Sequence, residues 1–371
     1  MKDVLAQLDA WSLQARPAAV ATVIATHGSA PRPIGAKMAV DARGQIAGAV
    51  SGGCVEGSVV ELATQVLAGA GAQVARFGIA DDEAWAVGLP CGGLIDVHVA
   101  PWDADPAGLP ARFAQLARAD ARAALVTVVS DEDRSRAAEG RRLLVLPDGA
   151  VEGNLEDEPA LAAAARAAAL DLVWDERSEL RSHDGAGLFV DVVAPAPRLI
   201  LFGAVPVAQA LCALARVAGW RPFVVDPRAR FATPERIPDA ERIVVAWPKE
   251  AVVELGGLDR ATAVAALTHD PKIDDVALEL ALRSGAGVVG AMGSRGATAE
   301  RRERLRHRGL SEAQIDRIAA PVGLDLGGTT DAETAISIMG ELVALRNGRA
   351  GGRLSAATGT IHARPLAAAP A

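Results

Sequence analysis

From residue 198 onward, short apolar runs alternate with longer stretches of helical spacing, and this alternation is the strongest constraint on the fold. Strands that are apolar throughout are buried on both faces, which is typical of a parallel sheet with helices on each side. We therefore expect a Rossmann-like, doubly wound α/β domain in this part of the chain. The predicted strands are 198–204, 222–226, 242–247, 262–270 and 287–292, and the predicted helices are 207–219, 270–285 and 332–348.

The preceding residues predict a separate, mixed α/β domain. A length of 371 residues favours two domains, and the prolines of APAPR (194–198) favour an extended linker between them. We expect the domains at 1–193 and 198–348, with a disordered tail at 349–371 that lacks periodicity, and no internal repeat is evident. In the first domain the predicted helices are 3–15, 59–69 and 157–169, the strands are 18–26, 94–101, 124–130, 141–149 and 188–195, and a hairpin covers 37–50.

Charge and cysteine content narrow the class of protein. The net charge of −8 argues against a nucleic-acid-binding protein, which normally has a basic face. Three cysteines do not form a disulfide scaffold and suit a reducing compartment. The first residues lack the apolar core of a signal peptide, and no stretch is apolar enough for a membrane span. We expect a cytoplasmic protein.

Residues 198–231 have the order of an opening βαβ unit of a dinucleotide-binding domain. Asp226 lies 23 residues after Gly203, close to the spacing of an acid that binds a ribose hydroxyl. A dinucleotide-binding turn normally has two further glycines, and this chain has Val205 and Ala208 at their positions. The Val205 side chain would obstruct the approach of the backbone to a pyrophosphate, which argues against bound NAD(P). Pro206 suits the first turn of a helix. The turn is interpreted either as a site for a phosphate-bearing ligand or as a scaffold that has lost dinucleotide binding.

Three further loops have the composition of anion sites. The loop with His269 and Asp270 follows a strand and precedes a helix. The loop with Gly293, Ser294 and Arg295 combines backbone amides, a hydroxyl and a guanidinium. The loop with Gly327 contains glycine and hydroxyl residues before a helix that Thr330 or Asp331 caps. Together they predict a small anionic ligand, although His269 is also compatible with a simple Asx-type turn.

Two turns in the first domain pair a cysteine with two glycines in opposite order. They are Gly52-Gly53-Cys54 and Cys91-Gly92-Gly93. Zinc normally requires paired ligands, which neither cysteine has nearby. A catalytic thiol at a helix N-terminus, a thiol that handles a ligand, and a small buried residue in a tight turn stay open. Cys212 lies in an apolar helical run and is predicted to be in the core. The carboxylate of Glu56, in the first turn of the following helix, stabilises that helix through the helix dipole, which is sufficient to explain an acid at this position.

These motifs resemble the xanthine dehydrogenase accessory factor family, XdhC/CoxI. The resemblance rests on GSAPRPIGAKMAV, GAVSGGCVEGSVVELA, GLPCGGLIDV, FGAVPVAQAL, LTHDPKID, GAMGSRGATAERRERLRHRGL and APVGLDLGGTTDAETAISIMGELVA, in that order from about residue 18 to 347. Its most specific parts are SGGCVEG with LPCGG and GAMGSR with GLDLG.

The resemblance implies a maturation factor for molybdenum hydroxylases. Such a factor binds the molybdenum–pterin cofactor (molybdopterin), holds it during sulfuration and passes it to an apoenzyme of the xanthine dehydrogenase type. A cysteine desulfurase partner and a homodimer are also implied. Cys54 and Cys91 would then lie near the cofactor and contact its molybdenum, and the anion loops would hold its phosphate or an attached nucleotide.

The chain departs from the family at two places. Many relatives have a glycine and a histidine where this chain has Val205 and Pro206, which puts nucleotide binding there in doubt. Residues 327–330 stand where an arginine is common. The favoured interpretation is a non-catalytic cofactor chaperone. The alternatives are an NAD(P)-dependent oxidoreductase or redox sensor, and a structural assembly factor that binds no small molecule.

Overall fold

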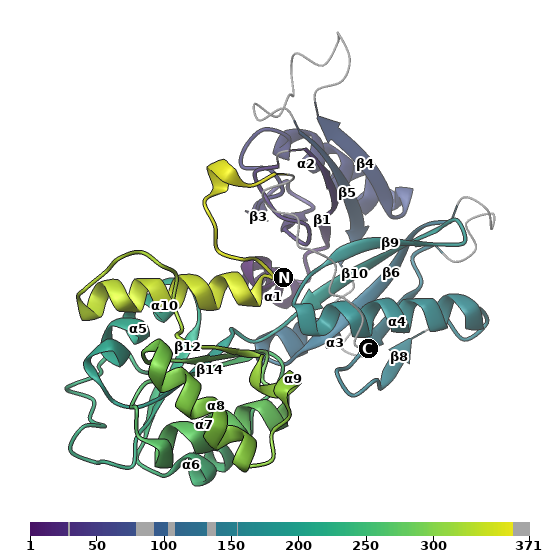
Figure 1. Ribbon diagram of the computed structural model, residues 1–371. Helices are drawn as coiled ribbons and strands as arrows, with labels where there is room; N and C mark the ends of the chain where they lie inside the picture. The colour runs from purple at the N-terminus through teal and green to yellow at the C-terminus, as the bar shows by residue number, and fades with distance from the viewer. Residues whose placement is uncertain (29, 79–92, 103–107, 132–138, 154, 359–371) are drawn as a thin grey trace. The chain divides into compact units, whose positions relative to one another are not determined.

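A computed structural model describes residues 1–28, 30–78, 93–102, 108–131, 139–153 and 155–358 (Figure 1). The chain divides into two compact units, Met1–Pro195 and Ala196–Ala371, and each is described by itself. The prediction of a mixed α/β domain followed by a Rossmann-like parallel sheet is confirmed. Among the described residues, no helix has the length and apolar character of a membrane span.

The first unit contains two five-stranded antiparallel sheets. The order of sheet A is β3-β2-β1-β5-β4 and that of sheet B is β8-β7-β6-β10-β9. The half of the unit that contains sheet A has the elements α1 (Lys2–Leu13), β1 (Ala18–His27), β2 (Lys37–Asp41), β3 (Ile46–Gly48), α2 (Glu56–Gln65) with its π-helical extension η1 (Val66–Ala70), β4 (Gln73–Gly78) and β5 (Leu94–Pro101). The half that contains sheet B has the elements α3 (Leu109–Arg118), β6 (Ala123–Asp131), β7 (Arg142–Val145), β8 (Val151–Gly153), α4 (Pro159–Asp175), β9 (Glu179–His183) and β10 (Ala186–Val193).

These two halves are a structural repeat, so the prediction of no internal repeat is wrong. Both halves run helix, three strands, helix, two strands, and both sheets have the same strand order. The strands β1 and β6 begin 105 residues apart, at Ala18 and Ala123, and β2 and β7 begin 105 residues apart as well. The hairpin turns also match, since Gly44 and Gly149 have φ of 75° and 88°.

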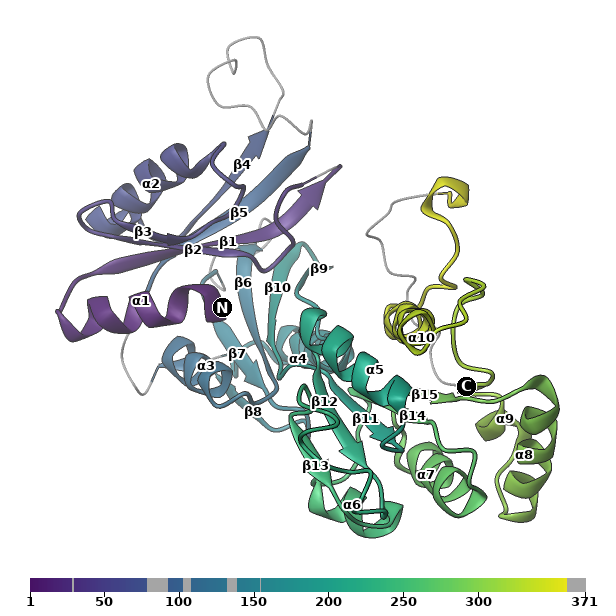
Figure 2. The same ribbon diagram turned by 90° about the vertical axis from the view of Figure 1, so that its left-hand side faces the viewer.

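Each sheet of the repeat has an outer face covered by a helix and an inner face turned toward the other sheet (Figure 2). The helix α2 packs on the outer face of sheet A through Val59 and Ala63, and α4 packs on sheet B. The inner faces meet through Ile24 and Phe189. Burying apolar side chains on both faces of each strand explains why β1 and β6 are apolar runs.

The second unit is a six-stranded parallel sheet with the order β13-β12-β11-β14-β15-β16. Counted within the unit this is 3-2-1-4-5-6, the order of a dinucleotide-binding Rossmann domain. Helices α5 and α10 cover one face, and α6, α7, α8 and α9 cover the other. The elements are β11 (Arg198–Phe202), α5 (Pro206–Val217), β12 (Arg221–Val225), β13 (Arg242–Val244), α6 (Pro248–Glu254), β14 (Thr262–Ala266), α7 (Pro271–Ser284), β15 (Val288–Ala291), α8 (Arg295–His307), α9 (Glu312–Ile315), β16 (Ile318–Ala319) and α10 (Asp331–Arg346).

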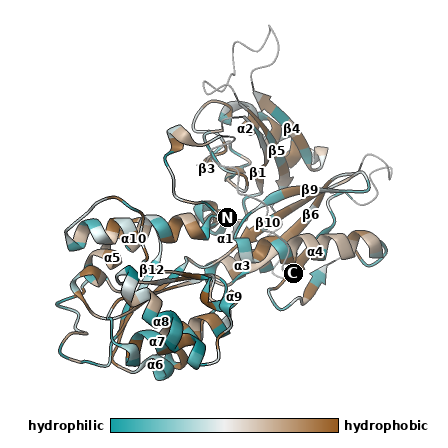
Figure 3. Cartoon of the chain, viewed as in Figure 1, coloured by the Kyte–Doolittle hydropathy of each residue, from teal (hydrophilic) through white to brown (hydrophobic). Residues whose placement is uncertain are grey.

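The structure also differs from the sequence expectation in several short or polar elements. The strands β4, β8, β9 and β16 and the helices α3, α6, α8 and α9 were not predicted. Figure 3 shows hydrophilic residues concentrated around α7 and α8, and α8 carries charged residues on most of its surface. In the expected tail, Leu354–Ala356 form a 3-10 turn, η2, and residues 359–371 lie outside the described part.

Candidate functional site

The Gly203 turn lies at the point where the strand order of the second unit reverses. Gly203 follows β11 with a φ of 122°, a region that side chains rarely adopt. A Cβ atom there would lie 2.5 Å from Cγ2 of Thr268, which follows the neighbouring strand β14. Val205 is the N-cap of α5, and Pro206 is its first residue, as predicted. The turn therefore brings the loops after β11 and β14 into direct contact.

Asp226, at the end of β12, is fully buried. Its Oδ2 accepts from the Ala204 amide at 2.8 Å and from Arg228 Nη2 at 2.7 Å, and its Oδ1 accepts from Arg228 Nε at 2.9 Å. Burial raises the pKa of Asp226, but the hydrogen bonds from Arg228 and Ala204 outweigh it and leave this pKa below its ordinary value. Both carboxylate oxygens are engaged, so a ribose hydroxyl would have to share them.

The loop after β14 is held by a buried carboxylate that the sequence analysis did not single out. Asp274, 1% exposed, accepts from Thr268 Oγ1 at 2.7 Å and from the His269 amide at 2.8 Å. His269 is exposed and has a left-handed φ of 66°. Asp270 is the N-cap of α7 and accepts from the Lys272 amide. Residues held in sparsely populated φ regions cluster at functional sites, so this loop is a reasonable ligand contact.

Arg301 lies beneath the loop after β15 and was missed by sequence reasoning. It is 3% exposed, and its Nη2 donates to the Met292 carbonyl at 3.0 Å and lies 3.6 Å from Oδ2 of Asp274. A Cβ atom on Gly293 would lie 3.7 Å from both Nη1 and Nη2. Within the described residues, Nε and Nη1 are buried without a hydrogen-bond partner. Buried donors normally have a hydrogen-bond partner, so these two N–H groups are available to a ligand or a water.

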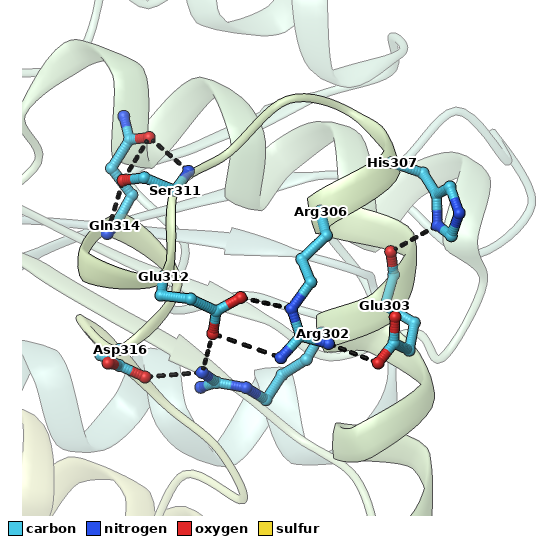
Figure 4. A network of polar contacts seen from close by, with 8 residues as sticks. All are labelled: Arg302, Glu303, Arg306, His307, Ser311, Glu312, Gln314 and Asp316. Atoms are coloured by element: carbon cyan, nitrogen blue, oxygen red, sulfur yellow. Dashed lines mark hydrogen bonds and ion pairs between the residues drawn. The ribbon is translucent and has the colours of Figure 1, made fainter.

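Other arginines of α8 form ion pairs nearer the surface, whereas Arg301 is buried and pairs with Asp274. Arg302 contacts Glu312 at 2.8 Å and Asp316 at 2.6 Å, and Arg306 contacts Glu303 and Glu312 (Figure 4). Exposed ion pairs of this kind contribute little to stability. Arg302 and Arg306 therefore join α8 to α9, whereas Arg301 packs beneath the Gly293 loop.

The remaining predicted residues of the second unit play different local roles. Ser294 caps α8 by accepting from the Ala297 amide at 3.1 Å, and Arg295, the first residue of α8, is exposed. Gly327 lies in an exposed loop, has a φ of 69° and has nothing within 4 Å of its Cβ position. Thr330 caps α10 in a capping box with Glu333, which confirms one of the two predicted caps.

The parallel sheet places most of these residues at one edge. Gly203, Asp226, His269 and Gly293 each follow a strand whose carboxyl end lies at the same side of the sheet. Ligands of open α/β sheets bind at this edge, where the strand order reverses. The edge combines a glycine turn, the N-terminus of α5 and the buried charge of Arg301, an arrangement suited to a phosphate or other anion.

The Cys54 turn in the first unit contains its own anion. Both oxygens of Glu56 accept from the turn: Oε1 from the amides of Ser51 and Gly52 at 2.9 Å each, and Oε2 from the Gly53 amide at 2.8 Å and from Ser51 Oγ at 2.5 Å. Gly52 and Gly53 have φ of 116° and 114°, which only glycine adopts readily. The turn is therefore a preformed loop that fixes the position of Cys54, rather than an empty anion cradle.

The cysteines differ in environment. Cys54 is half-buried at the end of this turn, and its amide donates to Ser51 Oγ at 3.1 Å. Cys91 and Gly92 lie outside the described residues, whereas Gly93 is buried just before β5. Cys212 is buried in α5, where burial raises the pKa of its thiol to about 12, which confirms it as a core residue. In the described ranges, no group of three histidine, cysteine or acidic side chains is arranged to hold a metal.

Replacing Glu56 by glutamine is expected to lower the free energy of unfolding by about 1–2 kcal/mol at neutral pH. Burial raises the pKa of Glu56, but the hydrogen bonds from Ser51 and from the amides of Gly52 and Ser51 lower it to about 2, against 4.5 for a free glutamate. The full shift is discounted here because the carboxylate is partly solvated. Since the folded pKa is depressed, the contribution of Glu56 is complete above pH 4.5 and disappears as the pH falls toward 2.

Urea unfolding across this pH range measures the effect, with Glu61→Gln as the matched control. Glu61 is exposed on the same helix, and its replacement should change stability by less than about 0.5 kcal/mol. A deficit for Glu56→Gln that persists undiminished at pH 2.5 would contradict the hydrogen-bonded carboxylate.

Comparison with known proteins covers most of both units. A model of the XdhC and CoxI family matches residues 11–78 and 116–184, and a model of the XdhC Rossmann domain matches residues 199–342. A probable xanthine dehydrogenase subunit from Bacillus subtilis is 28% identical over 346 residues, 91% of this chain and 96% of that protein. The molybdenum cofactor insertion chaperone PaoD of Escherichia coli is 25% identical over 336 residues, 90% of this chain and 85% of that protein.

A solved structure shares the fold. The crystal structure of a xanthine dehydrogenase from Bacillus halodurans superimposes with a TM-score of 0.63 at 24% identity, covering 95% of this chain and 97% of that chain.

Proposed function

Because the chain belongs to the XdhC and CoxI family, we propose that it is an accessory factor that binds the molybdenum–pterin cofactor as cargo. In this proposal it supports sulfuration of the cofactor and its insertion into an apoenzyme of the xanthine dehydrogenase type. One relative is a molybdenum cofactor insertion chaperone and another is a probable subunit of a xanthine dehydrogenase, which supports a role in maturation. A cysteine desulfurase as sulfur source, a homodimer and a cytoplasmic location belong to the same proposal.

The observation that carries this proposal is the buried, incompletely paired Arg301 beneath Gly293. A molybdenum–pterin cofactor ends in a phosphate, and a guanidinium recognises phosphate through two parallel N–H donors. Arg301 has two buried donors without partners in the described part of the chain. Gly293 has no side chain to cover them, and the Gly203 turn and the N-terminus of α5 lie at the same edge of the sheet. The residues therefore fit the anionic end of this cargo.

Cys54, in the first unit, is proposed as a thiol that handles the metal or the sulfur of the cargo. Thiolate sulfur is a ligand of soft metals and reacts with sulfur species. The turn held by Glu56 fixes the Cys54 backbone without using the thiol, because the hydrogen bonds of the turn are made by amides, Ser51 and Glu56. The same role is proposed for Cys91.

Molybdopterin retention tests the role of the thiols. The protein is purified from cells that make the cofactor, and molybdopterin is measured as its fluorescent oxidation product. Cys54→Ala should retain at least about fivefold less than the unchanged protein, because a thiol that contacts the metal is lost. The matched control is Cys212→Ala, which removes a cysteine from the core of the second unit. Equal retention by Cys54→Ala and Cys212→Ala would remove Cys54 from the mechanism.

An NAD(P)-dependent oxidoreductase is the second candidate, favoured by the 3-2-1-4-5-6 strand order. Two observations weigh against it. Val205 occupies the position where a glycine lets the backbone approach a pyrophosphate, and the oxygens of Asp226 already accept from Ala204 and Arg228. We expect no saturable change in the fluorescence of NADH or NADPH at protein or nucleotide concentrations up to the millimolar range. Saturable binding at micromolar nucleotide would instead favour the oxidoreductase.

A further inference from the structure

The inner faces of the two sheets of the first unit, together with Pro110 and Phe113 of α3, line a partly open cavity of about 70 Å³. A single buried water needs only about 10–15 Å³, so the cavity has room for several waters or one small ligand. All residues that line it belong to the first unit, from Met1 to Asp191. None of them belongs to the Cys54 turn or to the Rossmann edge described above.

The cavity is formed by equivalent positions of the structural repeat. On sheet A, the cross-strand neighbours Lys37, Thr22 and His98 form one row. On sheet B, the equivalent neighbours Arg142, Thr127 and Phe189 form the matching row. The two rows line the cavity together. Each repeat thus contributes a cation and a threonine, and the rows differ in their third member, which is His98 in one and Phe189 in the other.

Two polar groups in this cavity lack partners. His98 is 8% exposed and Thr127 is 7% exposed. Neither the ring nitrogens of His98 nor the Thr127 hydroxyl has a hydrogen bond to any described residue. Since both residues line the cavity, a water or a ligand there can accept from them.

The charged side chains that line the cavity are Lys37, Arg142 and Asp191, so cations outnumber anions there. Lys37, 3% exposed, donates toward Thr22 Oγ1 at 3.4 Å and pairs with Asp191 at 2.7 Å. Burial first, and then the charges of Arg142 and Lys37, lower the pKa of His98 to about 4. The imidazole is therefore neutral at pH 7 and offers one N–H donor in a positive potential. Leu125 and Phe113 give the cavity an apolar side.

We propose that this cavity binds a small carboxylate of one negative charge, held between the two repeats. The carboxylate group accepts from His98 and Thr127 and is attracted by the charges of Lys37 and Arg142, and a short alkyl group faces Leu125 and Phe113. The cavity admits a ligand about the size of acetate. This site is separate from the proposed molybdenum–pterin site and does not depend on it.

Acetate binding to the full chain tests this proposal. Broadening of the [13C]acetate resonance during titration gives a dissociation constant for each variant. We expect saturable binding at millimolar acetate or below, at least tenfold weaker in Thr127→Val and in His98→Phe, and unchanged in His183→Phe, which alters a partly exposed histidine of β9. His98→Phe places in one repeat the residue that the other repeat already has, Phe189, so the fold should accept it. Circular dichroism checks the fold of each variant.

Two competitors define the ligand class. Neutral acetamide has the shape of acetate without its charge, and nitrate has the charge without the alkyl group. Weak competition by both supports the proposal. Competition by acetamide equal to that of acetate would overturn the anionic assignment, and tighter binding of nitrate would overturn the carboxylate assignment. The proposal also fails if acetate does not saturate, or if Thr127→Val and His98→Phe bind it as well as the unchanged protein does.

Discussion

Replacing Arg301 by methionine is expected to lower the free energy of unfolding by about 3 kcal/mol and to abolish molybdopterin retention. Methionine has a similar volume but no charge, so Asp274 would stay buried without its cation. Removing one partner of a buried ion pair costs about 3–5 kcal/mol. Asp274 keeps its hydrogen bonds from Thr268 and His269, which places the expected loss at the lower end of this range. Urea unfolding of the full chain measures it.

The pH dependence of this loss has a definite sign. Burial raises the pKa of Asp274 above the ordinary value of 3.8, whereas the charge of Arg301 lowers it. Removing Arg301 therefore raises this pKa further. A carboxyl group whose folded pKa is raised destabilises the folded state only once it must ionise. The deficit of Arg301→Met should be smallest below pH 4 and grow as the pH rises through the folded pKa of Asp274.

Two further variants separate retention from stability. Arg295→Met removes the exposed first arginine of α8 and should change stability by less than about 0.5 kcal/mol. Arg301→Lys keeps a charge beside Asp274 but loses the paired donors of a guanidinium. We expect Arg301→Lys to fold and to retain clearly less cofactor than Arg295→Met. Full retention by Arg301→Lys, or a loss in Arg295→Met alone, would move the phosphate contact away from Arg301.

Replacing Gly203 by alanine is expected to cost about 3 kcal/mol. The φ of 122° is strained for any side chain, at about 1–3 kcal/mol. The new Cβ would also meet Cγ2 of Thr268 at 2.5 Å, so the loops after β11 and β14 would have to separate. Separation of these two loops should weaken cofactor retention as well.

Gly219→Ala is the matched control for this variant. Gly219 follows α5 in the same unit, has a φ of 75°, and has nothing within 4 Å of its Cβ position. Its replacement should cost only about 1 kcal/mol, the penalty for a left-handed φ. Adding Thr268→Ser to Gly203→Ala should recover part of the loss by removing Cγ2. Equal costs for Gly203→Ala and Gly219→Ala, measured by urea unfolding, would contradict the close approach of Gly203 to Thr268.

The Rossmann unit was predictable from sequence because its strands are apolar on both faces. Runs such as 198–204 and 222–226 have no other common interpretation when helices separate them. The strands β4 and β9 were missed because they lie at sheet edges and contain no fully buried residue. The helix α8 was missed because most of its residues are charged, and ion pairs join it to α9 beside a single buried leucine, Leu305.

The structural repeat was hidden for a different reason. Its two halves agree in strand order and register, while only short stretches of β1 and β6 and the hairpin glycines agree in residue type. Register is a property of hydrogen bonding between distant residues, so a reading along the chain does not reveal it.

The candidate site was predictable in its loops but not in its charges. Gly203, His269 and Gly293 follow from glycine content and strand ends. Arg301 does not, because one buried arginine among the many of α8 is distinguished only by packing beneath Gly293. The spacing of Asp226 suggested a ribose contact, yet its oxygens bind Ala204 and Arg228. For Glu56 a signal existed: an acid three residues after a glycine pair can reach the amides of that turn.

The molybdopterin content of the unchanged protein tests the central claim most directly. The full chain is purified from cells supplied with molybdate, and the fluorescent oxidation product is measured per mole of chain. The proposed function predicts a substantial fraction of one equivalent, and its release to a cofactor-free xanthine dehydrogenase-type enzyme with gain of hydroxylase activity. A content no higher than that of an unrelated protein purified in the same way would contradict it.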